Sequence, residues 1–125
     1  MKQTTLAIGH DAEKASLLFL QKQGLELITT NYRFKGGEID LIMSSSNNTL
    51  VFIEVRLRNS KGYGSGADSV TSSKQRKLSR TALHYMQSHQ QYEEWNIRFD
   101  VISLTSKLEK YDIEWIEEAF WPGDN

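Results

Sequence analysis

Two acidic residues interrupt runs of the sequence that are otherwise apolar and typical of β-strands. Asp40 lies within residues 36–42 and Glu54 within residues 50–56, and a short turn separates the two runs. A charged side chain in a buried strand loses its hydration, and two such acids side by side repel each other unless a cation lies between them. A hard divalent metal such as Mg²⁺ is the simplest cation of this kind. The pair therefore favours a fold in which two neighbouring strands bring both carboxylates to one place.

The length and composition are those of a small globular protein. The chain has 125 residues, of which 38% are hydrophobic, and this suits one domain with a modest core. The absence of cysteine excludes disulfides and thiolate zinc sites. The first residues lead into a polar-interrupted helix rather than a signal peptide, and no stretch reaches the roughly 20 apolar residues of a membrane span. We expect one domain over residues 1–125, located in the cytoplasm and without membrane contact.

Apolar periodicity and turn residues predict seven elements in the order α-β-β-β-α-β-β. Helical spacing and capping residues predict two helices, over about residues 5–23 and 71–90. Runs rich in β-branched and aromatic residues predict strands over residues 25–34, 38–43, 49–57, 96–104 and 111–119. Residues 59–68 carry three glycines and predict a flexible loop, and Pro122 and Gly123 predict the end of ordered structure.

The second and third predicted strands decide whether the two acids can meet. A serine and asparagine turn joins these strands, which favours an antiparallel hairpin. In such a hairpin, any register that pairs positions of equal parity places Asp40 opposite or diagonal to Glu54, whereas a slip of one residue would put them on opposite faces. The alternative for Glu54 and Arg56, which share one face, is a solvated charge ladder on a half-exposed strand. Residues 50–53 are apolar on both faces, which favours a central, buried strand. Glu38, beside the glycine turn, could simply be exposed.

The charge is distributed unevenly along the chain. The net charge of −1 argues against a protein held to nucleic acid by bulk electrostatics. From Arg56 to Arg80, however, seven cations accompany a single anion, Asp68, whereas from Glu93 onward nine acids accompany three bases. The basic segment is a candidate phosphate-facing surface. The alternative is a solvated loop and helix whose charge is balanced elsewhere in the fold.

The spacing of the acids resembles a known nuclease signature. Asp40, 13 intervening residues and Glu54-Val55-Arg56 resemble the Asp…(Asp/Glu)-x-Lys pattern of restriction-endonuclease-like nucleases. The closer resemblance is to the bacterial YraN-like family, which is similar to archaeal Holliday-junction resolvases. It is carried by residues 37–42 and 51–55, with further matches at Ala12, Glu13, Ala15, residues 31–33, Lys74 and residues 98–101. The resemblance implies a restriction-endonuclease-like α/β domain, with a central mixed sheet of about five strands flanked by helices.

The resemblance also implies a function and a set of site residues. It implies a metal-dependent endonuclease that hydrolyses phosphodiester bonds in DNA, including branched or structured DNA, with Mg²⁺ or alternatively Mn²⁺. Asp40 and Glu54 would be metal ligands, the carbonyl of Val55 a third, and Glu13 matches the extra acid of the resolvase-like members. The metal would lower the pKa of a bound water and offset charge on the phosphate. The alternative for Glu13 is an exposed acid in the first turns of a helix, where the helix dipole favours it.

One residue departs from the family pattern. Arg56 stands where the pattern has lysine, and arginine does not release its proton near neutral pH. As a catalytic residue it would instead hold a phosphate oxygen and stabilise charge in the transition state. Lys74 or Lys77 could supply the missing ammonium, and an ordinary helix-surface lysine is the alternative for each. The departure leaves open a second function, a catalytically weakened nucleic-acid-binding module of the same fold. The slightly negative net charge leaves open a third, a protein-interaction domain that binds no nucleic acid.

The remaining expectations concern partners. Basic residues near the predicted site are candidates for binding nucleic acid, and they are Arg33, Arg58, Lys74, Arg76 and Lys77. Resolvase-like relatives work as symmetric pairs because two strands must be cut, so the resemblance leaves a homodimer open.

Overall fold

The computed structural model describes residues 5–58 and 70–121, and the side chains from residue 10 onward in the first of these ranges. The elements follow the predicted order, with one short 3₁₀ helix, η2, added after the second helix. Their bounds are α1 (Thr5–Lys22), β1 (Glu26–Phe34), β2 (Gly37–Ser45), β3 (Thr49–Arg58), α2 (Ser72–Ser88), η2 (Gln90–Tyr92), β4 (Asn96–Lys107) and β5 (Lys110–Phe120). The predicted glycine loop at residues 59–68 and the predicted end of order at Pro122 and Gly123 lie outside the described residues.

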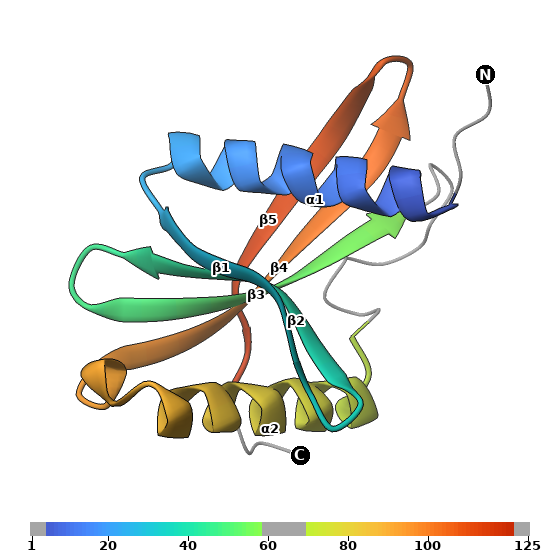
Figure 1. Ribbon diagram of the computed structural model, residues 1–125. Coiled ribbons are helices and arrows are strands. Elements are labelled where there is room, and N and C mark those ends of the chain that lie inside the picture. The colour runs from blue at the N-terminus through green and yellow to red at the C-terminus, as the bar shows by residue number, and fades with distance from the viewer. Residues whose placement is uncertain (1–4, 59–69, 122–125) are drawn as a thin grey trace.

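The five strands form one mixed sheet in the order β1-β2-β3-β4-β5. Neighbouring strands are antiparallel except β3 and β4, which are parallel and are joined through α2. β3 is the central strand, as its apolar run predicted. Figure 1 shows α1 on one face of the sheet and α2 on the other.

Each face of the sheet has its own apolar core. On the α1 side, Leu20 of the helix packs with sheet residues such as Val51 and Ile53, all of them fully buried. On the α2 side, Leu78 and Tyr85 pack with Phe52 and other sheet residues. The alternation of β3 side chains between the two cores is what makes this strand apolar on both faces.

The sequence of α2 explains where the helix begins and how it packs. The Thr71 hydroxyl caps it by accepting a hydrogen bond from the Lys74 backbone N–H. Its buried residues are Leu78, Thr81, Ala82 and Tyr85. Thr81 is polar, but its hydroxyl donates to the Lys77 carbonyl at 2.8 Å, so it can be buried without an unsatisfied donor. Within the described residues, neither helix combines the length and the apolar content needed to cross a bilayer.

The turn between β1 and β2 lies directly against α2. Gly37, the first residue of β2, is buried, and a Cβ atom at this position would overlap the Thr81 hydroxyl and lie 3.1 Å from the Lys77 carbonyl oxygen. Only glycine fits this contact without movement of the helix or the strand. The contact places the first half of α2 next to the part of β2 that carries Asp40.

Candidate functional site

The two predicted acids lie where β2 and β3 separate. The last backbone pair of these strands joins Leu41 and Ile53, and continuing this register by one residue places Asp40 opposite Glu54. Beyond that point the Val55 backbone N–H donates to Asp40 Oδ2 at 2.7 Å, so the Asp40 carboxylate replaces the backbone carbonyl that a partner strand would offer. The observed register pairs positions of equal parity, which is the condition under which the two acids come together.

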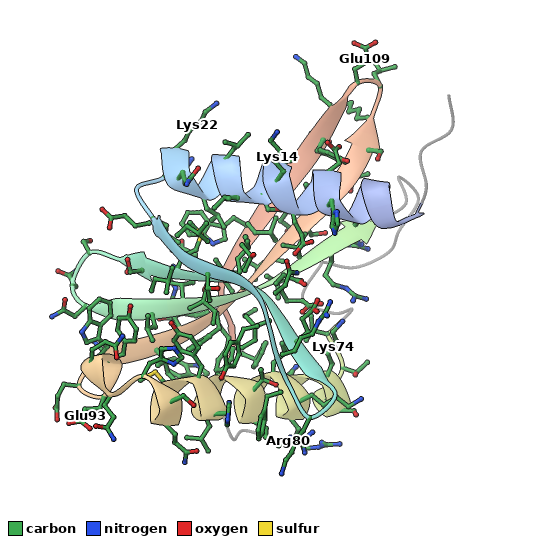
Figure 2. All side chains as sticks on the ribbon, viewed as in Figure 1. Lys14, Lys22, Lys74, Arg80, Glu93 and Glu109 are labelled. Carbon is green, nitrogen blue, oxygen red and sulfur yellow. The ribbon has the colours of Figure 1, made fainter. Side chains whose placement is uncertain are left out.

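Both acids line one pocket of about 380 Å³. β2 and β3 contribute the carboxylates, the β1–β2 turn contributes one wall, and the first half of α2 contributes two lysines. The lining residues are Gly36, Gly37, Glu38, Asp40, Glu54, Thr71, Ser73, Lys74, Lys77 and Leu78. Figure 2 shows Lys74 near the start of α2 on the side that faces the sheet, whereas Arg80 lies on the outer side of this helix.

The surroundings of Asp40 disfavour its charged form. Burial, and then the negative charge of Glu54, raise the pKa of the Asp40 carboxyl to about 8, although the hydrogen bond from Val55 opposes this shift. Glu13 and Glu38 add smaller repulsions. A bound cation would favour the ionised form of Asp40, because it would replace repulsion by attraction.

Glu54 is held between two cations. Its side chain is 7% exposed, and its Oε1 atom lies 2.8 Å from Lys74 Nζ and 3.6 Å from Arg56 Nη1. The alternative of a solvated charge ladder is therefore wrong for Glu54, whereas Arg56 is about one-third exposed. The nearer cation comes from α2 and not from the strand. Lys74 is therefore more than a helix-surface lysine, because it contacts the buried acid.

The donor atoms of this pocket suit Mg²⁺ better than a metal that needs a full protein cage. In the described ranges, no group of three or more histidine, aspartate or glutamate side chains is arranged to hold a metal. The pocket offers two carboxylates from adjoining strands. Mg²⁺ is usually bound through one or two carboxylates and keeps several waters, so these residues fit it. The structure shows the Val55 N–H bonded to Asp40, and a ligand role for the Val55 carbonyl stays a prediction.

Glu13 lies beside this pocket and not in it. It lines a second pocket of about 320 Å³ between α1 and β1, and its Oε1 atom accepts a hydrogen bond from Asn31 Nδ2 at 2.8 Å. α1 begins at Thr5, so Glu13 lies well past the first turn and the helix-dipole alternative is wrong. The sequence did not single out Asn31, although Asn31 belongs to one of the segments that carry the resemblance. An asparagine inside a strand run is the signal that could have identified it.

The basic candidates are only partly brought together. Lys74 and Lys77 line the pocket, and exposed Arg33 forms an ion pair with Glu38, which lines it as well. Arg76 is exposed on α2, and Arg58 ends β3; neither lines the pocket. Lys74 and Lys77 are therefore the cations best placed to meet a phosphate group beside the two acids.

The fold and the position of the acids define a class. A five-stranded mixed sheet between α1 and α2, with two carboxylates where β2 and β3 separate, is a restriction-endonuclease-like fold. The chain belongs to the family described as Uncharacterised protein family UPF0102, whose family model matches residues 12–104. This is the YraN-like family, so the resemblance found in the sequence is confirmed.

Relatives from several bacteria match most of the chain. A UPF0102 protein of Coxiella burnetii (strain RSA 493) is 46% identical over 119 residues, which cover 95% of this chain and 96% of the relative. A UPF0102 protein of Cupriavidus pinatubonensis is 45% identical, with 95% and 89% covered. Among solved structures, Pyrococcus furiosus SfsA in complex with Ca²⁺ is 12% identical with a TM-score of 0.30, and the match covers 82% of this chain and 58% of that one. A likeness this low adds nothing to the assignment.

Proposed function

We propose that this protein is a Mg²⁺-dependent endonuclease that hydrolyses phosphodiester bonds in DNA, including branched DNA. The observation that carries the proposal is that Asp40, Glu54 and Lys74 line one open pocket although they come from three different elements. Two acids and an ammonium are the groups that a metal-assisted attack on a phosphodiester requires.

The two acids would hold the metal in this site. Bound Mg²⁺, or Mn²⁺ in its place, would lower the pKa of a water molecule and offset negative charge on the phosphate. Asp40 is already oriented by the Val55 N–H, so its carboxylate would need little rearrangement. Glu54 is oriented by Lys74 in the same way. Glu13 would add negative charge from the neighbouring pocket.

Lys74 would take the place of the motif lysine. Its Nζ atom contacts Glu54 directly, whereas the Arg56 guanidinium lies farther from the same oxygen. An ammonium can donate to a phosphate oxygen as a compact charge. Arg56 would act beside it by stabilising charge on the phosphate, since arginine keeps its proton.

The basic residues around the pocket would position the DNA backbone. Lys77 lies one helical turn from Lys74 and lines the same pocket, and Arg76 is exposed on the same helix. Arg33 near the end of β1 and Arg58 at the end of β3 would extend this surface. A branched substrate cut symmetrically would require two copies of the chain, so a homodimer is part of the proposal.

A nucleic-acid-binding module without turnover is the second candidate. The observation that favours it is that Lys74 and Arg56 both pair with Glu54, so two protein cations already balance this acid. In this alternative the pocket would bind a phosphate through Lys74 and Lys77 and would not need a metal.

Cleavage assays test the first proposal. Four-way junctions and linear duplexes are incubated with the purified protein and Mg²⁺, Mn²⁺ or EDTA. We expect metal-dependent cleavage that falls by about 10³-fold or more in Asp40→Asn, because a ligand of the metal loses its charge. Asp112→Asn, an exposed acid on β5, is the matched control and should cleave normally. Paired nicks on opposite arms of the junction would indicate a homodimer.

If wild type gives no metal-dependent product, the enzyme is eliminated. Binding assays then decide between the nucleic-acid-binding module and a protein-interaction domain. The affinity for DNA should then fall steeply with salt and weaken in Lys77→Ala, but not in Lys22→Ala at the far end of α1. Absent or salt-insensitive binding would eliminate the binding module as well and favour a protein-interaction domain.

A further inference from the structure

The turn between β1 and β2 contains a lysine in a backbone conformation that disfavours it. Phe34 pairs with Gly37, so Lys35 and Gly36 form a two-residue hairpin turn. Both turn residues have positive φ angles, +44° and +81°, as a type I′ turn requires. Such positions usually hold asparagine, aspartate or glycine, because longer side chains are strained in the left-handed region. The needs of the turn therefore do not explain the lysine.

The Lys35 ammonium lies against an aromatic ring that is held in place. Its Nζ atom is 5.4 Å from the centroid of the Phe34 ring, a distance at which a cation is attracted to an aromatic face. The Phe34 ring stacks on His84 of α2, with centroids 3.8 Å apart and an angle of 11° between the planes. His84 Nδ1 forms a hydrogen bond of 2.6 Å with the Tyr32 hydroxyl. The ring that the ammonium contacts is therefore fixed between β1 and α2.

The same turn borders the pocket that contains the two acids. Gly36, the residue after Lys35, lines this pocket, and Gly37 lies against α2. Figure 1 shows the turn next to the first half of α2. Lys35 is exposed, so its ammonium lies at the rim of the pocket and not inside it. A polyanion that enters the pocket would pass this charge.

The charge of Lys35 is not balanced by a nearby acid. Among the side chains that the structure describes, no carboxylate lies within 4 Å of its Nζ atom. Two other cations beside the pocket are paired, Arg33 with Glu38 and Lys74 with Glu54. A paired cation must share its charge between the acid and a phosphate, whereas Lys35 can bind a phosphate without breaking an ion pair.

We propose that Lys35 binds a backbone phosphate of the DNA strand that enters the pocket, and that the Phe34 ring holds its ammonium in place for this contact. The inference rests on the proposed function, because it concerns the same substrate. A phosphate bound at the rim would fix the position of the strand relative to Asp40 and Glu54. The contact is to the backbone, so it would not depend on the base sequence.

The alternative is a lysine that only covers the aromatic cluster, and substitutions separate the two roles. Lys35→Asn suits the left-handed turn and removes the charge, whereas Lys35→Arg keeps the charge and can still contact the ring. Leu108→Asn is the control for the turn, because Leu108 has a φ of +55° in the β4–β5 turn. Lys22→Asn is the control for the charge, because Lys22 is exposed at the end of α1.

The experiment measures binding of a four-way junction and a linear duplex by fluorescence anisotropy in EDTA, over a range of salt concentrations. We expect Lys35→Asn to weaken binding roughly five- to tenfold at about 0.1 M salt and to lower the salt slope by about 1, because one phosphate contact is lost. Lys35→Arg and both controls should bind as wild type does. Thermal unfolding checks the fold, and Lys35→Asn should not lower the Tm, because asparagine relieves strain in the turn.

Four results would overturn the inference. Lys35→Asn could keep the affinity and salt slope of wild type, Lys35→Arg could lose as much affinity as Lys35→Asn, Lys22→Asn could lose as much as well, or wild type could bind no DNA.

Cleavage assays with Mg²⁺ on the same variants keep this outcome apart from the proposed function. Wild type that binds DNA without cleaving it rejects the enzyme, and weaker binding by Lys35→Asn would still support the phosphate contact. If wild type cleaves DNA, Lys35→Asn should raise KM by the same factor and leave kcat unchanged. An unchanged KM beside normal cleavage by wild type would reject only the role of Lys35.

Discussion

Asp40 on β2 and Asp100 on β4 lie in the same sheet, two strands apart, but their partners differ in kind. The Asp100 side chain accepts four hydrogen bonds, two from the Arg98 guanidinium at 2.9 Å, one from Trp115 Nε1 at 2.9 Å and one from the Glu118 backbone N–H at 3.0 Å. Asp40 accepts one from Val55 and faces the like charge of Glu54. Asp100 is fully satisfied by the protein, and Asp40 is not.

The difference separates a structural acid from a candidate functional one. Asp100 is 1% exposed and lies at an irregularity in the β4–β5 register, where it holds the edge strand in place. Asp40 lines an open pocket, and its unfavourable charge is a cost that folding alone does not explain. Burial of an acid is therefore a weaker sign of function than burial without enough partners.

The largest expected effect is on stability at Asp100. In Asp100→Ala, the Arg98 guanidinium, Trp115 Nε1 and one backbone N–H lose their acceptor, so the unfolding free energy should fall by about 3 kcal/mol. Urea denaturation measures this fall, and Asp112→Ala on β5 is the control, with an effect within about 0.5 kcal/mol. A loss below about 1 kcal/mol would contradict the structural role.

The next effect concerns the metal. At one hundred times its Kd, Mg²⁺ should raise the unfolding free energy of wild type by about 2.7 kcal/mol, because it binds only the folded chain. Asp40→Asn should lose this increment, and Asp100→Ala should keep it. Thermal unfolding with and without Mg²⁺ measures the increment. Equal increments in both variants would place the metal elsewhere in the protein.

The pH dependence of stability follows from the raised pKa of Asp40. The folded state binds the Asp40 proton more tightly than the unfolded state does. Without metal, the contribution of this group to the unfolding free energy therefore falls as pH rises from about 4 to about 8. Asp40→Asn should therefore gain about 1 kcal/mol or more relative to wild type between pH 4 and pH 9. Urea denaturation across this range measures the gain, with Asp112→Asn as the control. If Asp40→Asn were instead stabilised relative to wild type only at low pH, the pKa of Asp40 would not be raised in the folded state.

The smallest effect is expected at Lys74. Lys74→Met removes the nearest cation from Glu54, but Lys74 is 36% exposed and solvent screens the pair, so the stability loss without metal should stay below about 1 kcal/mol. Mg²⁺ affinity should rise a few-fold, since the metal no longer competes with the ammonium, whereas DNA cleavage should fall. Lys22→Met is the control for both measurements. Weaker Mg²⁺ binding would mean that Lys74 supports the metal rather than competing with it.

The order of elements and the meeting of the two acids could be predicted because both depend on local patterns. Alternation of apolar residues indicated the strands, the serine and asparagine turn indicated the hairpin, and equal parity then brought Asp40 to Glu54. The partners of these acids could not be predicted in the same way. Lys74 reaches Glu54 across 20 positions of sequence, and only the packing of α2 on the sheet decides that Lys74 contacts the acid more closely than Arg56 does.

The left-handed conformation of Asn31 and the four partners of Asp100 were also beyond the sequence. Asp100 lies at a shift in the β4–β5 register, and Asn31 has a positive φ angle at a single position of β1. Local features of this kind leave only a weak trace in the pattern of apolar residues. The 3₁₀ helix η2 was missed for a related reason, because a three-residue turn is too short to show periodicity.

Gly37 sets how wide the proposed active site can be. Because Gly37 has no side chain, β2 can contact α2 at Thr81. The distance between the strand that carries Asp40 and the helix that carries Lys74 therefore depends on a glycine at this position. A methyl group there would overlap the Thr81 hydroxyl and crowd the Lys77 carbonyl, so the contact between β2 and α2 would have to shift although every charged residue stayed in the sequence. The protein would keep all of its reactive groups, but the distances between them would change.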